Sequence, residues 1–458
     1  MTSRVVRVAN GQGFWGDDLE APVRQVEGGP IDYLALDYLA EVTMSIMQKL
    51  RSRDPAAGYA RDFAPLMERI FPACISGGVR VISNAGGVNP DAAADAVIEA
   101  GRSSGVAGQA KVGLVAGDDL MERLDDLIAA GERFENMETG EPLESILGRV
   151  QSANAYLGAA PIVRALELGA DVVVTGRCAD AALTYGPLMH EFGWHEDDFD
   201  RIGAGVAAGH INECGAQATG GNCSIEWWDI PNLADVGFPI VEVSEDGSFV
   251  VTKHLGTGGR VTSATVTEQI VYEIGDPAAY ITPDAVADFT SLELTDLGDD
   301  RVRVTGAKGR SRTDSLKVSI AYSAGWKAVG TLTYAWPDAA AKARAADRIL
   351  RSRLEGLGLH FEEMRTELVG WDSTHGHLAG EPPADLPEVQ LRIGVRAAER
   401  APVERFTREI APLVLTGPPS VTGFAGGRPR VQEVMAYWPA LIRREAVEPH
   451  VTVDVREV

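Results

Sequence analysis

Short apolar runs alternate with amphipathic segments through the first half of the chain. The apolar runs are rich in β-branched residues and lie at residues 4–9, 79–83, 111–115 and 171–174. A turn rich in glycine, asparagine or aspartate follows each run, and helical patterns cover residues 91–101 and 120–130. Strands that alternate with helices predict a parallel or mixed sheet flanked by helices.

A different pattern begins near residue 223. We expect strands at residues 224–230, 249–254, 260–274, 301–306, 316–322, 330–336, 361–370, 389–396 and 451–455. Helices are expected at residues 339–354 and 403–413. The fold class is therefore α/β for residues 1–222, followed by a strand-rich α+β region at 223–335 and a small α+β domain at 336–458.

The expected parallel sheet has a geometric consequence. The turns at residues 10–17, 84–89, 117–119 and 176–180 all leave the carboxyl ends of strands, so they must share one edge of the sheet. We expect residues 209–222 to fold over that edge and to close a pocket that His210 or Glu213 faces.

Composition limits the class of protein. A chain of 458 residues with 45% hydrophobic and 24% charged residues predicts two or three globular domains. The net charge of −24 argues against binding to nucleic acid or to an anionic membrane, but not against a small anionic metabolite held in a local basic pocket. Four cysteines without paired spacing, and no signal peptide or membrane-spanning run, predict a cytoplasmic protein. A homo-oligomer is compatible with these bounds.

The stretch at residues 209–222 carries the densest set of reactive groups. His210, Glu213 and Cys214 would share one face of a helix, so they are the catalytic candidates, as an acid/base pair or as a Cys–His nucleophile. Gln217 and Asn222, with Gly220 and Gly221, are substrate-binding candidates. The alternative is a hydrogen-bonded structural histidine. A metal is disfavoured because no second Cys/His cluster has ligand spacing.

The first turn is the next candidate. Asn10, Gly11 and Gly13 could offer backbone amides to a carbonyl or carboxylate, with Asp17 orienting the pocket. A dinucleotide site is disfavoured because two aspartates would meet the pyrophosphate. The alternative is a tight turn without a ligand.

Two further turns hold candidates at the same edge. Asn84, Gly86 and Gly87 could line a site, whereas the neighbouring Asn-Pro pair suits a helix cap. Arg177 could hold an anionic group, or it could pair internally with Asp180.

A glycine turn in the second half resembles an anion-binding nest. Lys253 and Arg260 flank Gly258 and Gly259 in this segment. The alternative is a loose hairpin turn.

The chain resembles the acyclic terpene utilisation (AtuA) family. The matching blocks are residues 33–43, 82–90, 117–119, 152–157, 170–180, 209–221, 253–259, 265–272, 276–284 and 301–306. Residues 370–373 and 416–419 resemble the ferredoxin-like domain that often follows. The resemblance implies a role in the catabolism of acyclic terpenes, beside biotin-dependent acyl-CoA carboxylases and enoyl-CoA hydratases.

Two functions follow as hypotheses. The first is an enzyme that acts on an acyl-CoA thioester or a related branched oxo- or hydroxy-acid by lyase, hydratase or isomerase chemistry. No bound cofactor is predicted, and coenzyme A enters only as part of a substrate. The second is a non-catalytic metabolite-binding or assembly subunit that associates with other acyl-CoA catabolic enzymes.

Overall fold

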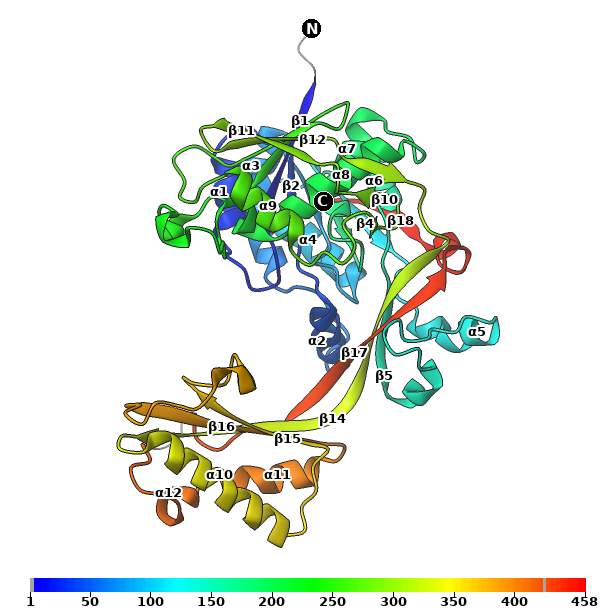
Figure 1. Ribbon diagram of the computed structural model, residues 1–458. Coiled ribbons are helices and arrows are strands. Elements are labelled where there is room, and N and C mark those ends of the chain that lie inside the picture. Colours follow the sequence, from blue (N-terminus) through cyan, green and yellow to red (C-terminus); the bar gives the residue numbers. More distant parts are fainter. Residues whose placement is uncertain (1–3, 423–425) are drawn as a thin grey trace. The chain divides into compact units, whose positions relative to one another are not determined.

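The computed structural model describes residues 4–422 and 426–458 (Figure 1). Contacts divide the chain into two compact units. Unit 1 comprises Met1–Ala321 with Tyr437–Val458, and unit 2 comprises Tyr322–Ala436. These units do not coincide with the three expected ranges, because the strand-rich region continues the first sheet and the last strand returns to it.

Five neighbouring strands in unit 1 run parallel. In sheet order they are β1 (Val5–Gln12), β2 (Tyr33–Leu36), β3 (Arg80–Ser83), β6 (Val172–Thr175) and β4 (Lys111–Ala116). Each is mostly apolar because both faces of the sheet are covered. Their carboxyl ends therefore meet at one edge, which confirms the expected placement of the four turns.

Antiparallel strands extend this sheet on both sides. Beyond β1 follow β7 (Ile240–Ser244), β8 (Phe249–Thr252), β12 (Arg301–Thr305) and β11 (Glu293–Gly298). At the other end β18 (Thr452–Glu457) pairs with β4. The ten-stranded sheet is thus mixed.

Helices connect and cover the strands of unit 1. They are α1 (Ala21–Glu27), α2 (Glu41–Arg51), α3 (Phe63–Gly77), α4 (Pro90–Ser103), α5 (Leu124–Ala129), α6 (Ala160–Glu167), α7 (Ala182–Phe192), α8 (Phe199–Glu213) and α9 (Ser263–Val271). The start of α4 is as the sequence predicts: the Asn89 side chain accepts a hydrogen bond from the Ala92 amide, and Pro90 takes the first helical position.

Smaller elements complete unit 1. Strand β5 (Val150–Ala155) pairs with β14 (Ser315–Ala335), while β13 (Lys308–Arg310), β10 (Val286–Asp288) and β9 (Tyr280–Ile281) form a separate sheet. The 3-10 turns are η1 (Met121–Arg123), η2 (Leu143–Ser145), η3 (Leu147–Arg149), η4 (Gly215–Thr219), η5 (Trp227–Asp229), η6 (Leu233–Asp235), η8 (Arg444–Ala446) and η9 (Glu448–His450). None of the helices in the described ranges is long and apolar enough to cross a bilayer.

Unit 2 follows a β-α-β-β-α-β order. Its sheet order is β15 (Glu363–Val369), β16 (Glu388–Ala397), β14 (Ser315–Ala335) and β17 (Gln432–Arg443), and the outer parts of β14 and β17 belong to unit 1. Its helices are α10 (Ala339–Gly356), α11 (Arg400–Glu409), α12 (Leu413–Thr416) and the 3-10 turn η7 (Gly376–Ala379). One face of the sheet packs on α10 and α11 around a core that includes Leu332, Leu350, Ile393 and Phe406.

Two expected strands are wrong. Residues 224–230 contain η5, and residues 260–274 contain helix α9. The β-branched residues of α9 suggested a strand, but Thr262 and Thr265 form a reciprocal capping box that starts a helix. The expected strands at 316–322 and 330–336 are parts of the single strand β14.

The core of unit 2 predicts one stability effect. Ile393 is fully buried between the sheet and its helices, so Ile393→Ala should lower the free energy of unfolding by about 2–5 kcal/mol in urea titrations. The exposed Leu378 provides the control, because Leu378→Ala should change it by no more than about 0.5 kcal/mol. Equal effects of the two substitutions would contradict this assignment of the core.

Candidate functional site

Several titratable side chains line a pocket of about 400 Å³ in unit 1. Asp180 reaches it from the turn after β6, and His210 and Glu213 reach it from the last turn of α8. The rest of the lining includes Tyr156, Glu273, Asp276, Tyr280 and Lys317. The pocket thus brings together three of the residues that the sequence singles out.

His210 and Glu213 form a buried pair at the end of α8. They are three residues apart, so they share a face of the helix, and His210 Nδ1 lies 3.0 Å from Glu213 Oε1. His210 Nε2 lies 3.3 Å from the Ile270 carbonyl oxygen, and the Tyr280 hydroxyl lies 3.5 Å from Nδ1. The imidazole is therefore held on both sides, and its contacts orient the carboxyl of Glu213.

The environment of this pair favours a protonated carboxyl group. Burial raises the pKa of Glu213 to about 7, although the hydrogen bond from His210 lowers it. Burial lowers the pKa of His210, but the hydrogen bond and charge of Glu213 outweigh it, so the net shift is upward. Glu213 Oε2 is buried and has no hydrogen-bond partner in the described chain. The raised pKa lets this carboxyl group take up or release a proton near neutral pH.

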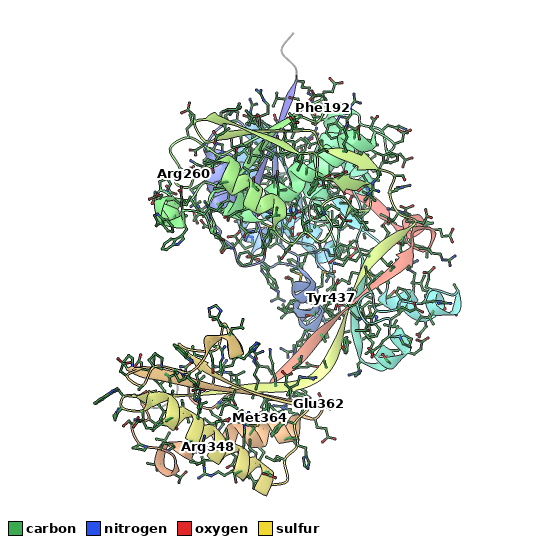
Figure 2. All side chains as sticks on the ribbon, in the orientation of Figure 1. Phe192, Arg260, Arg348, Glu362, Met364 and Tyr437 are labelled. Atoms are coloured by element: carbon green, nitrogen blue, oxygen red, sulfur yellow. The ribbon has the colours of Figure 1, made fainter. Side chains whose placement is uncertain are left out.

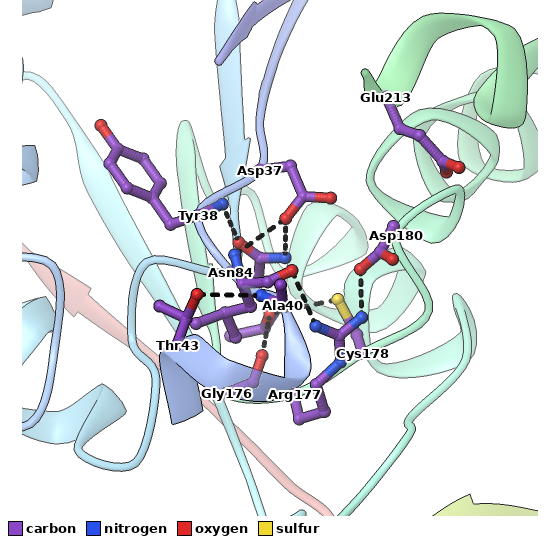
Figure 3. Close-up of polar contacts among 12 residues, drawn as sticks. Asp37, Tyr38, Ala40, Thr43, Asn84, Gly176, Arg177, Cys178, Asp180 and Glu213 are labelled. Atoms are coloured by element: carbon purple, nitrogen blue, oxygen red, sulfur yellow. Dashed lines mark hydrogen bonds and ion pairs between the residues drawn. The ribbon is translucent and has the colours of Figure 1, made fainter. Parts of the chain in front are cut away.

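Arg177 is a fully buried cation beside the pocket (Figure 3). Its guanidinium donates to the Leu39 carbonyl at 2.9 Å, forms an ion pair with Asp180, and lies 4.3 Å from the centre of the Tyr156 ring. Arg177 does not line the pocket. The internal-pair alternative thus describes its contacts, and Asp180 presents its carboxylate to the pocket.

Asp37 and Asn84 extend the network at the ends of β2 and β3. Asp37 Oδ1 accepts hydrogen bonds from Asn84 Nδ2 at 2.7 Å and from the Leu39 amide at 3.0 Å (Figure 3). Burial raises the pKa of Asp37 well above its usual value, and the charge of Asp180 adds to this shift. Asn84 therefore fixes a buried carboxyl group that the sequence analysis missed.

Asp118 anchors the turn that carries Arg177. Its carboxylate accepts the Arg177 amide and Asn154 Nδ2, each at 2.8 Å. A Cβ atom at Gly176 would stand 2.3 Å from Asp118 Oδ1, which explains the glycine. Burial raises the pKa of Asp118 to about 6. The turn after β6 is thus fixed by the end of β4.

Internal contacts occupy the first glycine turn. The Asp17 carboxylate accepts the Gly13 amide at 2.9 Å, so this amide does not face a ligand. Asn10 Nδ2 lies 3.4 Å from the Glu213 carbonyl oxygen. A Cβ atom at Gly11 or Gly13 would collide with Leu36 or with the Gly215 backbone. The expected carbonyl-binding turn is therefore a packing contact between β1 and the end of α8.

The other edge residues are likewise held within the protein. The Gly86 amide donates to Thr175, and Gly87 adopts a φ of +54° beside Met47. Gln217 donates to Gln269 at 3.2 Å and accepts from Asn222 at 3.0 Å. The amides of Gly220 and Gly221 donate to Gln217 and Ala216. None of these candidates lines the pocket.

The expected anion nest is also closed. Gly258 and Gly259 donate their amides to the Asp235 and Pro231 carbonyls, at 2.8 and 2.7 Å. Lys253 pairs with Asp300 at 2.9 Å, and Arg260 (labelled in Figure 2) donates to the Asp229 carbonyl at 2.6 Å. The donors of this turn therefore bind carbonyl groups of the loop at residues 229–235, and not an anion.

Cys214 does not have the features of a nucleophile. It is half-buried, and burial with the nearby charge of Glu213 raises the pKa of its thiol above the ordinary range. A thiol that stays protonated attacks weakly. Within the described ranges, no group of three His, Cys, Asp or Glu side chains is arranged to hold a metal ion.

Several residues of the pocket wall are not predicted by the sequence pattern. Tyr280, Glu273 and Asp276 come from the segment after α9, and Lys317 and Tyr156 come from β14 and the end of β5. The Lys317 ammonium lies 4.9 Å from the centre of the Tyr156 ring. No local motif marks these residues, because the packing of distant segments brings them to the pocket.

The mixed α/β sheet and its acidic, titratable pocket define a protein whose candidate site lies beside the carboxyl edge of parallel strands. The chain belongs to the acyclic terpene utilisation family AtuA, whose family model matches residues 6–453. No curated protein and no solved structure matches the chain.

Glu213 predicts a pH effect on stability. Its pKa is raised in the folded state, so the folded protein binds more protons than the unfolded chain between about pH 4.5 and 7. The stability of the wild type relative to Glu213→Gln should therefore fall as pH rises through this window, by about 1 kcal/mol or more. Urea titrations from pH 5 to 8 measure the difference.

The exposed pocket residue Glu273 supplies the control for this effect. Glu273→Gln removes an exposed carboxyl group of the same pocket, so it separates the loss of any carboxyl group from the loss of Glu213. A constant difference between wild type and Glu213→Gln would show that Glu213 titrates alike in the folded and unfolded states.

Proposed function

We propose that the chain is an acid/base enzyme of the lyase, hydratase or isomerase type that acts on an acyl thioester or a related branched oxo- or hydroxy-acid. One observation carries the proposal: Glu213 is a buried carboxyl group with its pKa raised to about 7 and with an unpartnered Oε2 atom, in the wall of a pocket. Acid/base groups are most effective when their pKa lies near the working pH.

Two carboxyl groups of the pocket have different environments, which supports different roles for them. Asp180 forms an ion pair with Arg177, so it serves as the carboxylate base. Glu213 is desolvated and its pKa is raised to about 7, so a substantial fraction carries a proton near neutral pH and it serves as the acid. Asp180 removes a proton from the carbon next to the carbonyl group, and Glu213 donates its proton to the oxygen that becomes negative. His210 positions Glu213.

The charge of the pocket restricts the reacting end of the substrate. Asp180, Glu213, Glu273 and Asp276 line the pocket, and Lys317 is the lysine among its lining residues. Carboxylates disfavour a second anion inside a partly desolvated site. A neutral thioester, ketone or hydroxyl group therefore suits the interior, and phosphate or carboxylate groups of the substrate remain outside it.

The proposal predicts loss of proton transfer on substitution. Glu213→Gln and Asp180→Asn should each lower the rate by about 10²- to 10⁴-fold, because each removes a proton donor or acceptor. The measurement is solvent deuterium exchange at the α-carbon of branched acyl thioesters, followed by mass spectrometry. The wild-type rate should fall as pH rises above about 7, where Glu213 loses its proton.

Matched variants separate chemistry from folding. Glu273→Gln changes an exposed carboxyl of the same pocket and should retain most of the rate. Thermal melting verifies that each variant is folded. Wild-type exchange rates in both Glu213→Gln and Asp180→Asn would refute the assigned roles. Tight thioester binding without exchange or turnover in the wild type would instead support a non-catalytic binding subunit.

A further inference from the structure

A second hollow, of about 310 Å³, lies wholly in unit 2. The segment from Gly426 to Arg430, just before β17, forms one wall, and Val329 and Thr331 of β14 belong to another. These residues take no part in the pocket of unit 1. The hollow is therefore a separate feature that the proposed acid/base chemistry leaves unexplained.

Apolar contacts anchor the segment that carries the two arginines of the hollow. Pro429 packs on Gly330, since its Cγ atom lies 3.5 Å from the position of a Gly330 Cβ, and Val431 packs against the core of the unit. Arg428 and Arg430 both line the hollow, together with Pro429 between them.

The backbone beside the arginines is open to a ligand. Gly426 and Gly427 both have positive φ angles, +75° and +76°, and both line the hollow. A Cβ atom at either glycine would meet no atom within 4 Å. Consecutive glycines allow a ligand to approach the main chain closely.

The two arginines of the hollow belong to a unit whose formal charges balance. The unit carries 14 Arg and Lys and 14 Asp and Glu side chains, so it is neutral within a protein of net charge −24. Several of its arginines pair with carboxylates within 4 Å: Arg344, Arg351, Arg365, Arg392, Arg396, Arg400 and Arg405. Neither Arg428 nor Arg430 has a hydrogen-bond or ion-pair partner in the part of the chain that the structure describes.

We propose that this hollow binds a phosphate or diphosphate ester. Two guanidinium groups can each present a pair of N–H donors to phosphate oxygens, and the open backbone of the glycines lets the anion approach. The inference goes beyond the proposed function, because none of the residues that line this hollow belongs to the acidic pocket of unit 1.

The surface next to the hollow suits the neutral part of such a ligand. Val329 also lines a shallower hollow of about 220 Å³, which includes Gly394 and Val434. A Cβ atom at Gly394 would lie 3.8 Å from a methyl group of Val329. Val329, Gly394 and Val434 thus form an apolar strip, which the charged residues Lys327, Glu363, Arg365 and Arg396 border.

Isothermal titration of the full chain with pyrophosphate and with coenzyme A tests the proposal. Both ligands should bind, and coenzyme A should bind more tightly because its neutral arm reaches the apolar strip. The double variant with Arg428→Ala and Arg430→Ala should bind both ligands at least about 10-fold more weakly. The double variant with Arg428→Lys and Arg430→Lys should regain part of the lost affinity, because lysine restores the positive charge but not the planar guanidinium group.

Two variants make the outcome specific. Arg348 is exposed on α10 (Figure 2), and Arg348→Ala, which removes one positive charge elsewhere in the unit, should leave binding unchanged. Glu213→Gln should also bind both ligands normally, so failure of the acid/base proposal leaves this result intact. Absence of binding by the wild type, or equal binding by the double alanine variant, would overturn the phosphate site.

Discussion

The buried positive charge of Arg177 is the constraint on which the carboxyl edge of the sheet depends. A guanidinium that is fully removed from water requires compensation by acceptors and carboxylates. The Leu39 carbonyl and the Asp180 carboxylate supply this compensation, and the Tyr156 ring adds a cation–π contact. The ends of β2, β5 and β6 are thereby fixed to one another around a single cation.

The acidic pocket follows from this arrangement. Arg177 stabilises a carboxylate on Asp180, whereas Glu213, which faces the same pocket from α8, has His210 as its partner and is desolvated. Two carboxyl groups near each other but in different environments need not lose their protons together. The fold thus gives two carboxyl groups of one pocket different partners.

The sequence predicts the parts of the fold that depend on local pattern. Alternation of apolar runs with helices was sufficient to place β1, β3, β4 and β6 and their shared edge, because strand polarity follows from the crossovers alone. It missed β2 and therefore Asp37, because Tyr33–Leu36 is a four-residue strand without a distinctive period. It also took α9 for a strand, because the capping box that starts this helix consists of β-branched threonines.

The candidate site is harder to predict because distant segments complete it. His210 and Glu213 stand in one helical turn, so their pairing is visible in the sequence, whereas Tyr280 and Lys317 reach the pocket only through tertiary packing. Glycine-rich turns such as the one at Gly258 look like ligand sites, yet their amides bind carbonyl groups of the facing loop. The most direct test is an infrared titration of the carboxyl C=O stretch. The wild type should show a carboxyl band that disappears near pH 7 and that is absent from Glu213→Gln. A Glu213 band that has already disappeared below about pH 5 would contradict the raised pKa of this group.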